Sequence, residues 1–212
     1  MYEAIGLKNL LLDKCLSTRA REEMAATYDK FLAHAIKDHQ FALSPGNIRG
    51  GLTTIEEKSM GAVIKIGSCP ISGVLKLGQK PPYAGAWYVD MISDDETGCG
   101  FPISEDASSN LLYAASGAHL CLLTSGRGHV VNNPIIPTLK LTGNSETFQR
   151  LSEDTDFDAS PLLSGVSLQD VTEALLELIT GILNGQKTRG EVLGHAEAVL
   201  NFENQQAYVL GT

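Results

Sequence analysis

The chain has 212 residues, of which 43% are hydrophobic and 19% are charged, and its formal net charge is −9. This composition is typical of a soluble globular protein that is large enough for a proper hydrophobic core. An acidic chain without a basic stripe lacks the clustered Lys and Arg that neutralise phosphates, so nucleic acid and anionic membranes are not expected partners. The sequence has no apolar run of about 18 residues and no secretory signal at its start, so we expect a cytoplasmic protein.

The first part of the chain is predicted to be mostly helical. Apolar residues recur at helical spacing, so residues 1–40 are expected to form a helical N-terminal segment, with a restart at Ser17 or Thr18. A turn-rich loop follows, which contains Pro45, Gly46, the glycine pair Gly50-Gly51 and several polar residues. Thr54 and Glu57 then have the spacing of a capping box, which predicts the start of another helix.

Helices and strands alternate along the rest of the chain. The predicted elements are a short helix at 70–77, strands at 86–91, 119–123 and 135–141, and helices at 106–116, 145–151, 167–184 and from 188. The run from His119 to Leu123 is apolar after its histidine, so we expect this strand to be buried on both faces. The alternation predicts one α/β domain over residues 1–212, built on an open, mainly parallel sheet. Because so few convincing strands are present, we expect this chain to be half of a sheet that another polypeptide or an upstream segment completes.

Candidate chemistry gathers where the predicted strands end. Ligands of such sheets collect at the carboxyl ends of the strands, where polar loops follow at 90–97, 124–129 and 142–144. The stretch SPGNIRGGLTTIEEKSMGAVIK at 44–65 places glycine turns beside charged residues at a helix start, an arrangement that suits an anion site. We expect this stretch to form the fourth wall of the site.

Each candidate residue also has an ordinary structural interpretation. Glu57 is either a helix cap or a group with a proton to exchange, and Lys58 is either functional or simply solvated. Asp90 ends an apolar strand, where it either binds a ligand or caps the next loop. Arg127 stands between two glycines after a buried strand, which suits a carboxylate or phosphate but also a surface turn. His129 is a metal ligand, a proton shuttle or neither.

Three motifs occur in order along nearly the whole chain. They are the stretch at 44–65, TSGRG at 124–128 followed by NPIIPTLKLTGN at 133–144, and NGQKTRGEVLGHAE at 184–197. Together they resemble the sugar-acid dehydratase family, which includes altronate dehydratase, galactarate dehydratase and the large subunit of sulfolactate sulfo-lyase. The resemblance implies a Rossmann-like C-terminal catalytic domain, of which this chain would be about the second half.

The resemblance also implies a reaction. We expect a hydro-lyase that dehydrates a sugar acid such as altronate or galactarate to a 2-keto-3-deoxy acid by metal-assisted β-elimination. The alternatives are a sulfolactate sulfo-lyase subunit, towards which DFDASPLL at 156–163 leans, and a non-catalytic subunit that completes a partner's sheet. The implied cofactor is a divalent metal, iron(II) or else manganese. The expected partners are a small anionic hydroxy acid and either a second copy of the chain or a partner subunit.

Roles for individual residues are a hypothesis about how this chain would carry out that reaction. Lys58 is the expected base or enolate-stabilising cation and Glu57 its proton partner, while Asp90 and His129 are the expected metal ligands. The expected substrate-binding residues are Asn47, Arg49, Gly50, Gly51, Thr53, Thr124, Gly126, Arg127 and Gly128.

Overall fold

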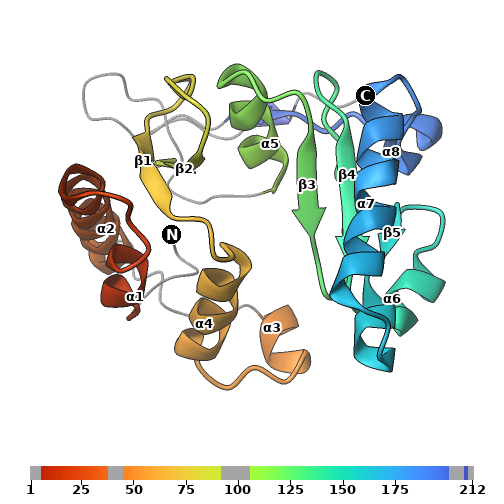
Figure 1. The fold of residues 1–212 in the computed structure, drawn as a ribbon, viewed down its shortest axis with the longest axis horizontal. Helices are drawn as coiled ribbons and strands as arrows, with labels where there is room; N and C mark the ends of the chain where they lie inside the picture. The colour runs from red at the N-terminus through yellow and green to blue at the C-terminus, as the bar shows by residue number, and fades with distance from the viewer. Residues whose placement is uncertain (1–5, 38–44, 92–105, 201–207, 210–212) are drawn as a thin grey trace. The chain divides into compact units, whose positions relative to one another are not determined.

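The computed structural model describes residues 6–37, 45–91, 106–200 and 208–209. The chain divides into two compact units, Met1–Pro102 and Ile103–Thr212, and each is described by itself. Except for one short antiparallel pair, Val199–Leu200 with Tyr208–Val209, the strands pair in parallel within open sheets flanked by helices, so the predicted α/β class is confirmed (Figure 1). No helix in the described part of the chain is long and apolar enough to cross a membrane. The single domain over 1–212 stays a prediction, and most of the loop predicted at 90–97 lies outside the described residues.

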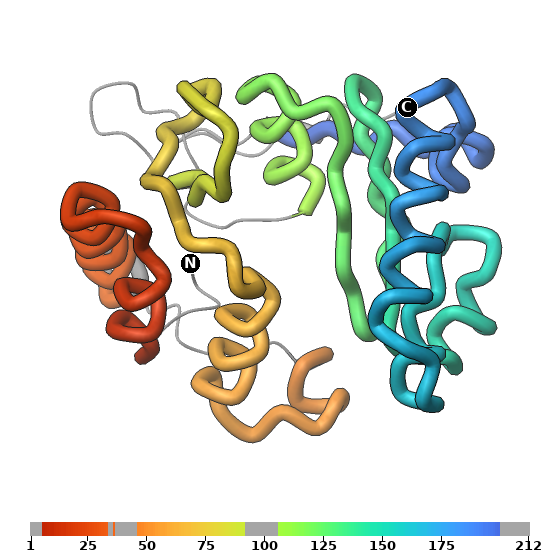
Figure 2. The backbone as a smooth tube through the Cα atoms, viewed as in Figure 1, coloured from red at the N-terminus to blue at the C-terminus, as the bar shows by residue number. Residues whose placement is uncertain are grey.

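The first unit combines helices with a short parallel sheet. Its elements are α1 (Lys8–Leu12), α2 (Thr18–Lys37), α3 (Pro45–Arg49), α4 (Ile55–Lys65), β1 (Ile71–Leu75) and β2 (Ala86–Val89). Figure 2 follows this part of the backbone in red to yellow. The predicted strand at 86–91 is confirmed as β2, and the predicted helix after Thr54 is confirmed as α4.

One apolar face of α2 packs into the core of the first unit, together with residues of α1, α4 and β1. Met24 and Phe31 lie on this face and are 0% and 1% exposed. The hydroxyl of Ser17 accepts a hydrogen bond from the first turn of α2 at 3.1 Å, so the predicted restart at this point is confirmed. Gly73 lets β1 approach α2 closely, because a Cβ on Gly73 would lie 2.9 Å from Glu23 Oε2.

The prediction of a short helix at 70–77 is wrong, because these residues contain strand β1. Burial alternates along β1, with Ile71, Gly73 and Leu75 buried, and β1 pairs in parallel with β2. The sequence ISGVL therefore follows the two-residue period of a strand. A proline just before a strand costs no ladder hydrogen bond, so Pro70 is compatible with either structure.

The second unit is built around a three-stranded parallel sheet with the order β3-β4-β5 (Figure 1). Its elements are α5 (Asp106–Ala115), β3 (Cys121–Thr124), β4 (Thr138–Thr142), α6 (Ser145–Arg150), β5 (Phe157–Asp158), the 3₁₀ helix η2 (Ser160–Ser164), α7 (Leu168–Leu183), α8 (Arg189–Leu193), β6 (Val199–Leu200) and β7 (Tyr208–Val209). The helices and strands predicted here are confirmed with small shifts at their ends, whereas β5 and η2 were not predicted.

Strand β4 is the buried centre of the second unit. Thr138, Lys140 and Thr142 are at most 2% exposed, and strand alternation places all three side chains on one face. Strand β3 has β4 as its only partner in the described sheet, and Leu122 on β3 is 47% exposed. The expectation that residues 119–123 are buried on both faces is therefore wrong.

Candidate functional site

The glycine-rich stretch folds into α3 and a tight turn instead of an open loop. The Gly50 N–H donates to Gly46 O at 3.0 Å, and the Leu52 N–H donates to Asn47 O at 3.2 Å. Gly51 has a φ of 98°, and its N–H donates to a carbonyl of the same turn at 3.0 Å. These backbone donors are satisfied inside the turn. Anion binding by the backbone of Gly50 or Gly51 would therefore require this turn to open.

The capping box at the start of α4 is confirmed, and it fixes the geometry of Glu57. The Glu57 carboxylate accepts hydrogen bonds from the Thr53 N–H at 2.7 Å, the Thr53 hydroxyl at 2.8 Å and the Thr54 N–H at 3.3 Å. The backbone N–H of Thr53, followed by the other two donors, lowers the pKa of Glu57. Glu57 is therefore held as a carboxylate. Its role in the capping box does not exclude its predicted role as the proton partner of Lys58.

Lys58 directly follows Glu57 in the first turn of α4. The side chain of Lys58 is half-buried, as is that of Asn47, whereas Arg49 is exposed. Because the capping box holds the first turn, it also fixes the backbone from which Lys58 projects. The role of Lys58 as a base stays a prediction.

The loop after β3 is tied to α6 through its own backbone. Thr147 Oγ1 donates to Gly126 O at 2.9 Å, and Arg150 Nη2 donates to Arg127 O at 3.1 Å. Gly128 has a φ of 86°, and a Cβ at this position would clash with the residue that ends α6. This anchoring leaves the Arg127 side chain exposed at the carboxyl end of β3, where the sequence predicted it.

The predicted binding residues come from both units. Asn47, Arg49, Gly50, Gly51 and Thr53 belong to the first unit, and Thr124, Gly126, Arg127 and Gly128 belong to the second. Within each unit the predicted residues lie on one short segment. That the two groups serve one site stays a prediction.

His129 forms an ion pair with Asp106. Its Nε2 lies 2.9 Å from Asp106 Oδ2, and its Nδ1 accepts a hydrogen bond from the Val131 N–H at 3.1 Å. The hydrogen bond to Asp106 raises the pKa of His129. Both ring nitrogens are engaged, so a metal could bind His129 only after one of these contacts breaks.

Asp90 directly follows β2, as the sequence predicted. Its N–H donates to Leu75 O at 2.8 Å, and its Oδ2 lies 3.9 Å from Lys30 Nζ. Within the described ranges, no three His, Cys, Asp or Glu side chains gather where they could hold a metal ion. The described side chains therefore do not form the expected metal site by themselves.

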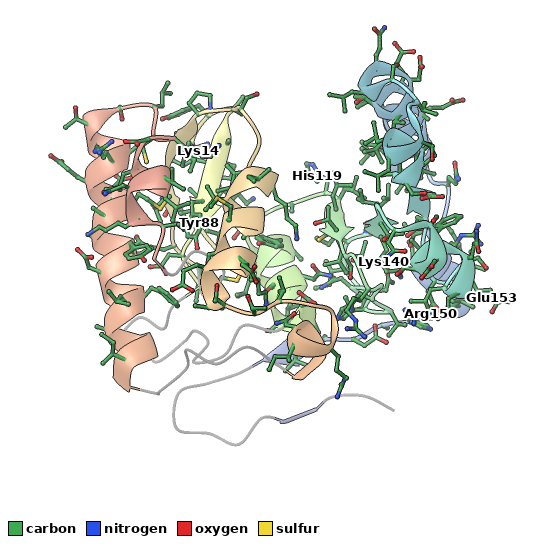
Figure 3. The ribbon with its side chains drawn as sticks, turned by 90° about the horizontal axis from the view of Figure 1, so that it is seen from below. Lys14, Tyr88, His119, Lys140, Arg150 and Glu153 are labelled. Atoms are coloured by element: carbon green, nitrogen blue, oxygen red, sulfur yellow. The ribbon has the colours of Figure 1, made fainter. Side chains whose placement is uncertain are left out.

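A polar cluster in the second unit, with two buried and two half-buried members, was not predicted from the sequence. This Lys140 cluster consists of Asn132, Lys140, Asp156 and Glu197 (Figure 3 labels Lys140). Asp156 Oδ2 accepts a hydrogen bond from the Lys140 N–H at 2.8 Å, and Glu197 Oε2 accepts one from the Asn132 N–H at 2.9 Å. The sequence signal was present, because a lysine stands in the middle of the otherwise uncharged strand TLKLT.

Comparison with known proteins assigns a family to the chain. The family described as "D-galactarate/Altronate dehydratase, C-terminal" matches residues 1–205. The (2R)-sulfolactate sulfo-lyase subunit beta of Chromohalobacter salexigens is 36% identical over 93% of this chain and 50% of its own length. The altronate dehydratase of Escherichia coli is 30% identical over 89% of this chain and 36% of its own length. The galactarate dehydratase (L-threo-forming) of the same organism is 29% identical over 80% of this chain and 30% of its length.

These relatives are longer than the chain. The chain spans half the length of the sulfo-lyase subunit and about a third of the two dehydratases. The family match nevertheless covers all three motifs, including α3 and α4 in the first unit and β3 to α8 in the second. The chain therefore belongs to the D-galactarate/altronate dehydratase family and corresponds to its C-terminal region.

Proposed function

We propose that the chain belongs to a lyase that removes water from a small anionic sugar acid such as altronate or galactarate. The observation that carries this proposal is the family match over residues 1–205, because it includes every motif in which the candidate residues lie. Relatives named altronate dehydratase and galactarate dehydratase support the leaving group and the substrate class.

The proposed reaction is a β-elimination. A base takes the proton from C2, the C3–O bond breaks as the departing hydroxyl accepts a proton, and the enol product tautomerises to a 2-keto-3-deoxy acid. Lys58 is the proposed base or enolate-stabilising cation, because a lysine fixed beside a capped helix start is held in a defined position. Glu57 is the proposed proton partner of Lys58; because Glu57 starts ionised, the proton that the departing hydroxyl accepts is the one removed from C2, passed on by Lys58 or Glu57.

Charged and amide side chains would hold the substrate. We assign carboxylate binding to Arg127 and Asn47, and contacts with the substrate to Arg49, Thr53 and Thr124. A guanidinium binds a carboxylate through two parallel hydrogen bonds, and the Arg127 side chain is exposed on an anchored loop. These assignments and the cytoplasmic location belong to the proposal.

A sulfo-lyase is the second candidate. The 36% identity with a sulfolactate sulfo-lyase subunit favours it, and the proton-abstraction step would be the same. Here the C3–S bond would break, and sulfite would leave in place of water. That relative is a named subunit, so we also propose that the chain acts with a partner subunit or a second copy. A non-catalytic role that completes a partner's sheet is the remaining alternative.

A divalent metal, iron(II) or manganese, stays part of the proposal. Such an ion would supply a Lewis acid for a carboxylate and hydroxyl of the substrate. The described Asp90 and His129 are engaged with Lys30 and with Asp106, so no step is assigned to a metal bound at these residues.

The test is to assay the chain, alone and with its partner subunit, against altronate, galactarate and sulfolactate with ferrous ion under reducing conditions. Formation of a 2-keto-3-deoxy acid from a sugar acid would support the dehydratase. Sulfite release from sulfolactate would select the sulfo-lyase instead. No product from any of the three would overturn both and leave the non-catalytic role.

A further inference from the structure

The second unit buries an ammonium group that has no hydrogen-bond partner. Lys140 is 2% exposed at the centre of β4, and its Nζ is not hydrogen-bonded to any group in the described part of the chain. The backbone of Lys140 is fully used, because its N–H donates to Asp156 Oδ2 at 2.8 Å and its carbonyl accepts from the Asp156 N–H at 2.8 Å. Only the side chain is left unsatisfied.

A buried amide lies next to this ammonium. Asn132 is 2% exposed, and its Nδ2 donates to His195 O at 2.8 Å. That hydrogen bond assigns the nitrogen and oxygen atoms of the amide. It leaves Asn132 Oδ1 buried without a hydrogen-bond partner among the described groups. The neighbouring Asn133 is fixed in the same way: its Oδ1 accepts two backbone N–H bonds, at 2.8 and 3.1 Å, and its Nδ2 is unpartnered.

The two unsatisfied groups meet at Gly190. A Cβ on Gly190 would lie 2.8 Å from Lys140 Nζ and 2.9 Å from Asn132 Cγ, so both side chains border the same point. Gly190 lies in α8 and its φ is outside the left-handed region, so backbone conformation does not require glycine there. Glycine is required there because the Lys140 ammonium and Asn132 pack directly against it, with Asn132 Cβ also 2.8 Å from the position of such a Cβ.

The nearby carboxylates do not satisfy the ammonium directly. Asp156 accepts the N–H groups of Lys140 and Arg189, and Glu197 accepts the Asn132 N–H. Burial lowers the pKa of Lys140, while the charges of Asp156, Asp154 and Glu197 oppose that shift. A leucine or methionine would fill this strand position at no such cost, so the buried lysine needs another explanation.

A small ligand with an anionic group and a hydroxyl would satisfy both groups at once. A carboxylate accepts hydrogen bonds from an ammonium, and a hydroxyl beside it donates to an amide oxygen. A cation would be repelled by Lys140, and an apolar ligand would leave both groups unpaired. We therefore propose that Lys140 Nζ and Asn132 Oδ1 bind the carboxylate and the adjacent hydroxyl of a small hydroxy acid, against Gly190.

The choice of a hydroxy acid rests on the proposed function, whereas the site itself rests on the buried groups. Entry of a ligand requires the segment 188–197 to move, because this segment covers the site. The segment is held by the hydrogen bonds of Asn132 to His195 and Glu197 and by the Arg189 N–H on Asp156. A ligand can therefore enter the proposed site only if these hydrogen bonds of the segment 188–197 break.

The test measures binding without turnover. The chain, with its partner subunit if one is required, is titrated without added metal with sulfolactate, galactarate, altronate and inorganic sulfate. Calorimetry gives the affinity, and the ¹⁵N signal of the Lys140 side chain reports the site. We expect at least one hydroxy acid to bind and shift this signal, with Lys140→Met weakening binding at least tenfold. Equal binding of sulfate would overturn the role of the hydroxyl.

Gly190→Ala gives an independent variant, because its methyl group would displace Lys140 Nζ and the Asn132 side chain from their present positions while alanine favours the helical backbone. Its matched control is Gly61→Ala, since Gly61 also lies in a helix and a Cβ there would meet nothing within 4 Å. We expect a tenfold loss of affinity in Gly190→Ala and less than a twofold change in Gly61→Ala. If Lys140→Met does not fold, Gly190→Ala decides.

The outcomes separate the two proposals. Binding at Lys140 without any elimination would retain this site and overturn the lyase. Elimination with wild-type affinity in Lys140→Met or Gly190→Ala would retain the lyase and overturn this site. Absence of hydroxy-acid binding to the wild-type chain would also overturn the site.

Discussion

The α3–α4 segment and the Lys140 cluster are both rich in polar groups, but they satisfy these groups in opposite ways. Around α4, Glu57 is paired with donors from Thr53 and Thr54 within four residues, at or near the surface. In the second unit, Lys140 and Asn132 are buried and come from segments distant from the ones that cover them. Hydrogen bonds between residues close in sequence can be predicted from the sequence. A buried polar group without a hydrogen-bond partner can be found only in the folded chain, and only there does it indicate function.

Lys58 provides the largest expected effect on activity. Lys58→Met removes the proposed base, and general base catalysis contributes roughly 10²- to 10⁴-fold, so turnover should fall by about that factor. Folding should be retained, because Lys58 is not part of the unit's buried core. The measurement is the steady-state rate together with the circular dichroism spectrum. Unchanged turnover would remove Lys58 from the mechanism.

Replacing Lys140 should make the chain more stable. Removing a buried charge in favour of an apolar side chain is often neutral or stabilising, so Lys140→Met should raise the free energy of unfolding by about 1–4 kcal/mol at pH 7. Chemical denaturation of the ligand-free chain measures this change. A loss of stability would mean that Lys140 is satisfied in the folded protein.

The stability advantage of Lys140→Met over the wild type should depend on pH. The pKa of Lys140 lies below its ordinary value of 10.5, so the unfolded chain binds its proton more tightly than the folded chain does. The loss of stability that the buried charge of Lys140 causes in the wild type is fully present below the pKa of Lys140 in the folded chain. It disappears as the pH rises to about 10.5. The advantage of Lys140→Met should therefore shrink between neutral and alkaline pH, and an advantage that grows would contradict this account.

The two capping boxes allow a matched comparison of the two units. Thr54 caps α4 and is exposed, whereas Thr188 caps α8 and is 0% exposed. Loss of an N-cap costs about 0.5–2 kcal/mol, and we expect Thr54→Ala near the lower end and Thr188→Ala near the upper end. Denaturant melts of the two variants test this order. Equal costs would show that burial adds nothing to the cap.

Replacing Glu57 should give the smallest change in stability, and this change should depend on pH. The pKa of Glu57 is lowered from 4.5, so its stabilising effect is present above that pH and is lost as the pH falls through the folded value. Glu57→Gln should lower Tm slightly at pH 7, and the difference from wild type should close in acid. A difference that persists unchanged in acid would contradict the role of the charge.

Sequence alone predicted what short-range patterns determine. Both capping boxes, the helices after residue 106 and the parallel α/β class follow from spacing, capping and alternation, and they are confirmed. Strand β1 was mistaken for a helix because Pro70 and Gly78 resemble helix ends, whereas pairing with β2 decides its structure.

The rest depends on contacts between distant segments. Asp156 accepts hydrogen bonds from the backbone N–H groups of Lys140 and Arg189, which lie 16 and 33 residues away in the sequence. The role of Lys140 likewise depends on Asn132 and Gly190, which lie elsewhere in the sequence. No spacing rule brings these three residues together.

Loss of the C2 proton tests the central claim most directly, because water and sulfite elimination share this step. Altronate, galactarate and sulfolactate are incubated with the chain and its partner subunit in D₂O and followed by proton NMR. We predict that one substrate loses its C2 proton as its 2-keto product appears with one deuterium at C3. Retention of the C2 proton in all three would contradict the account.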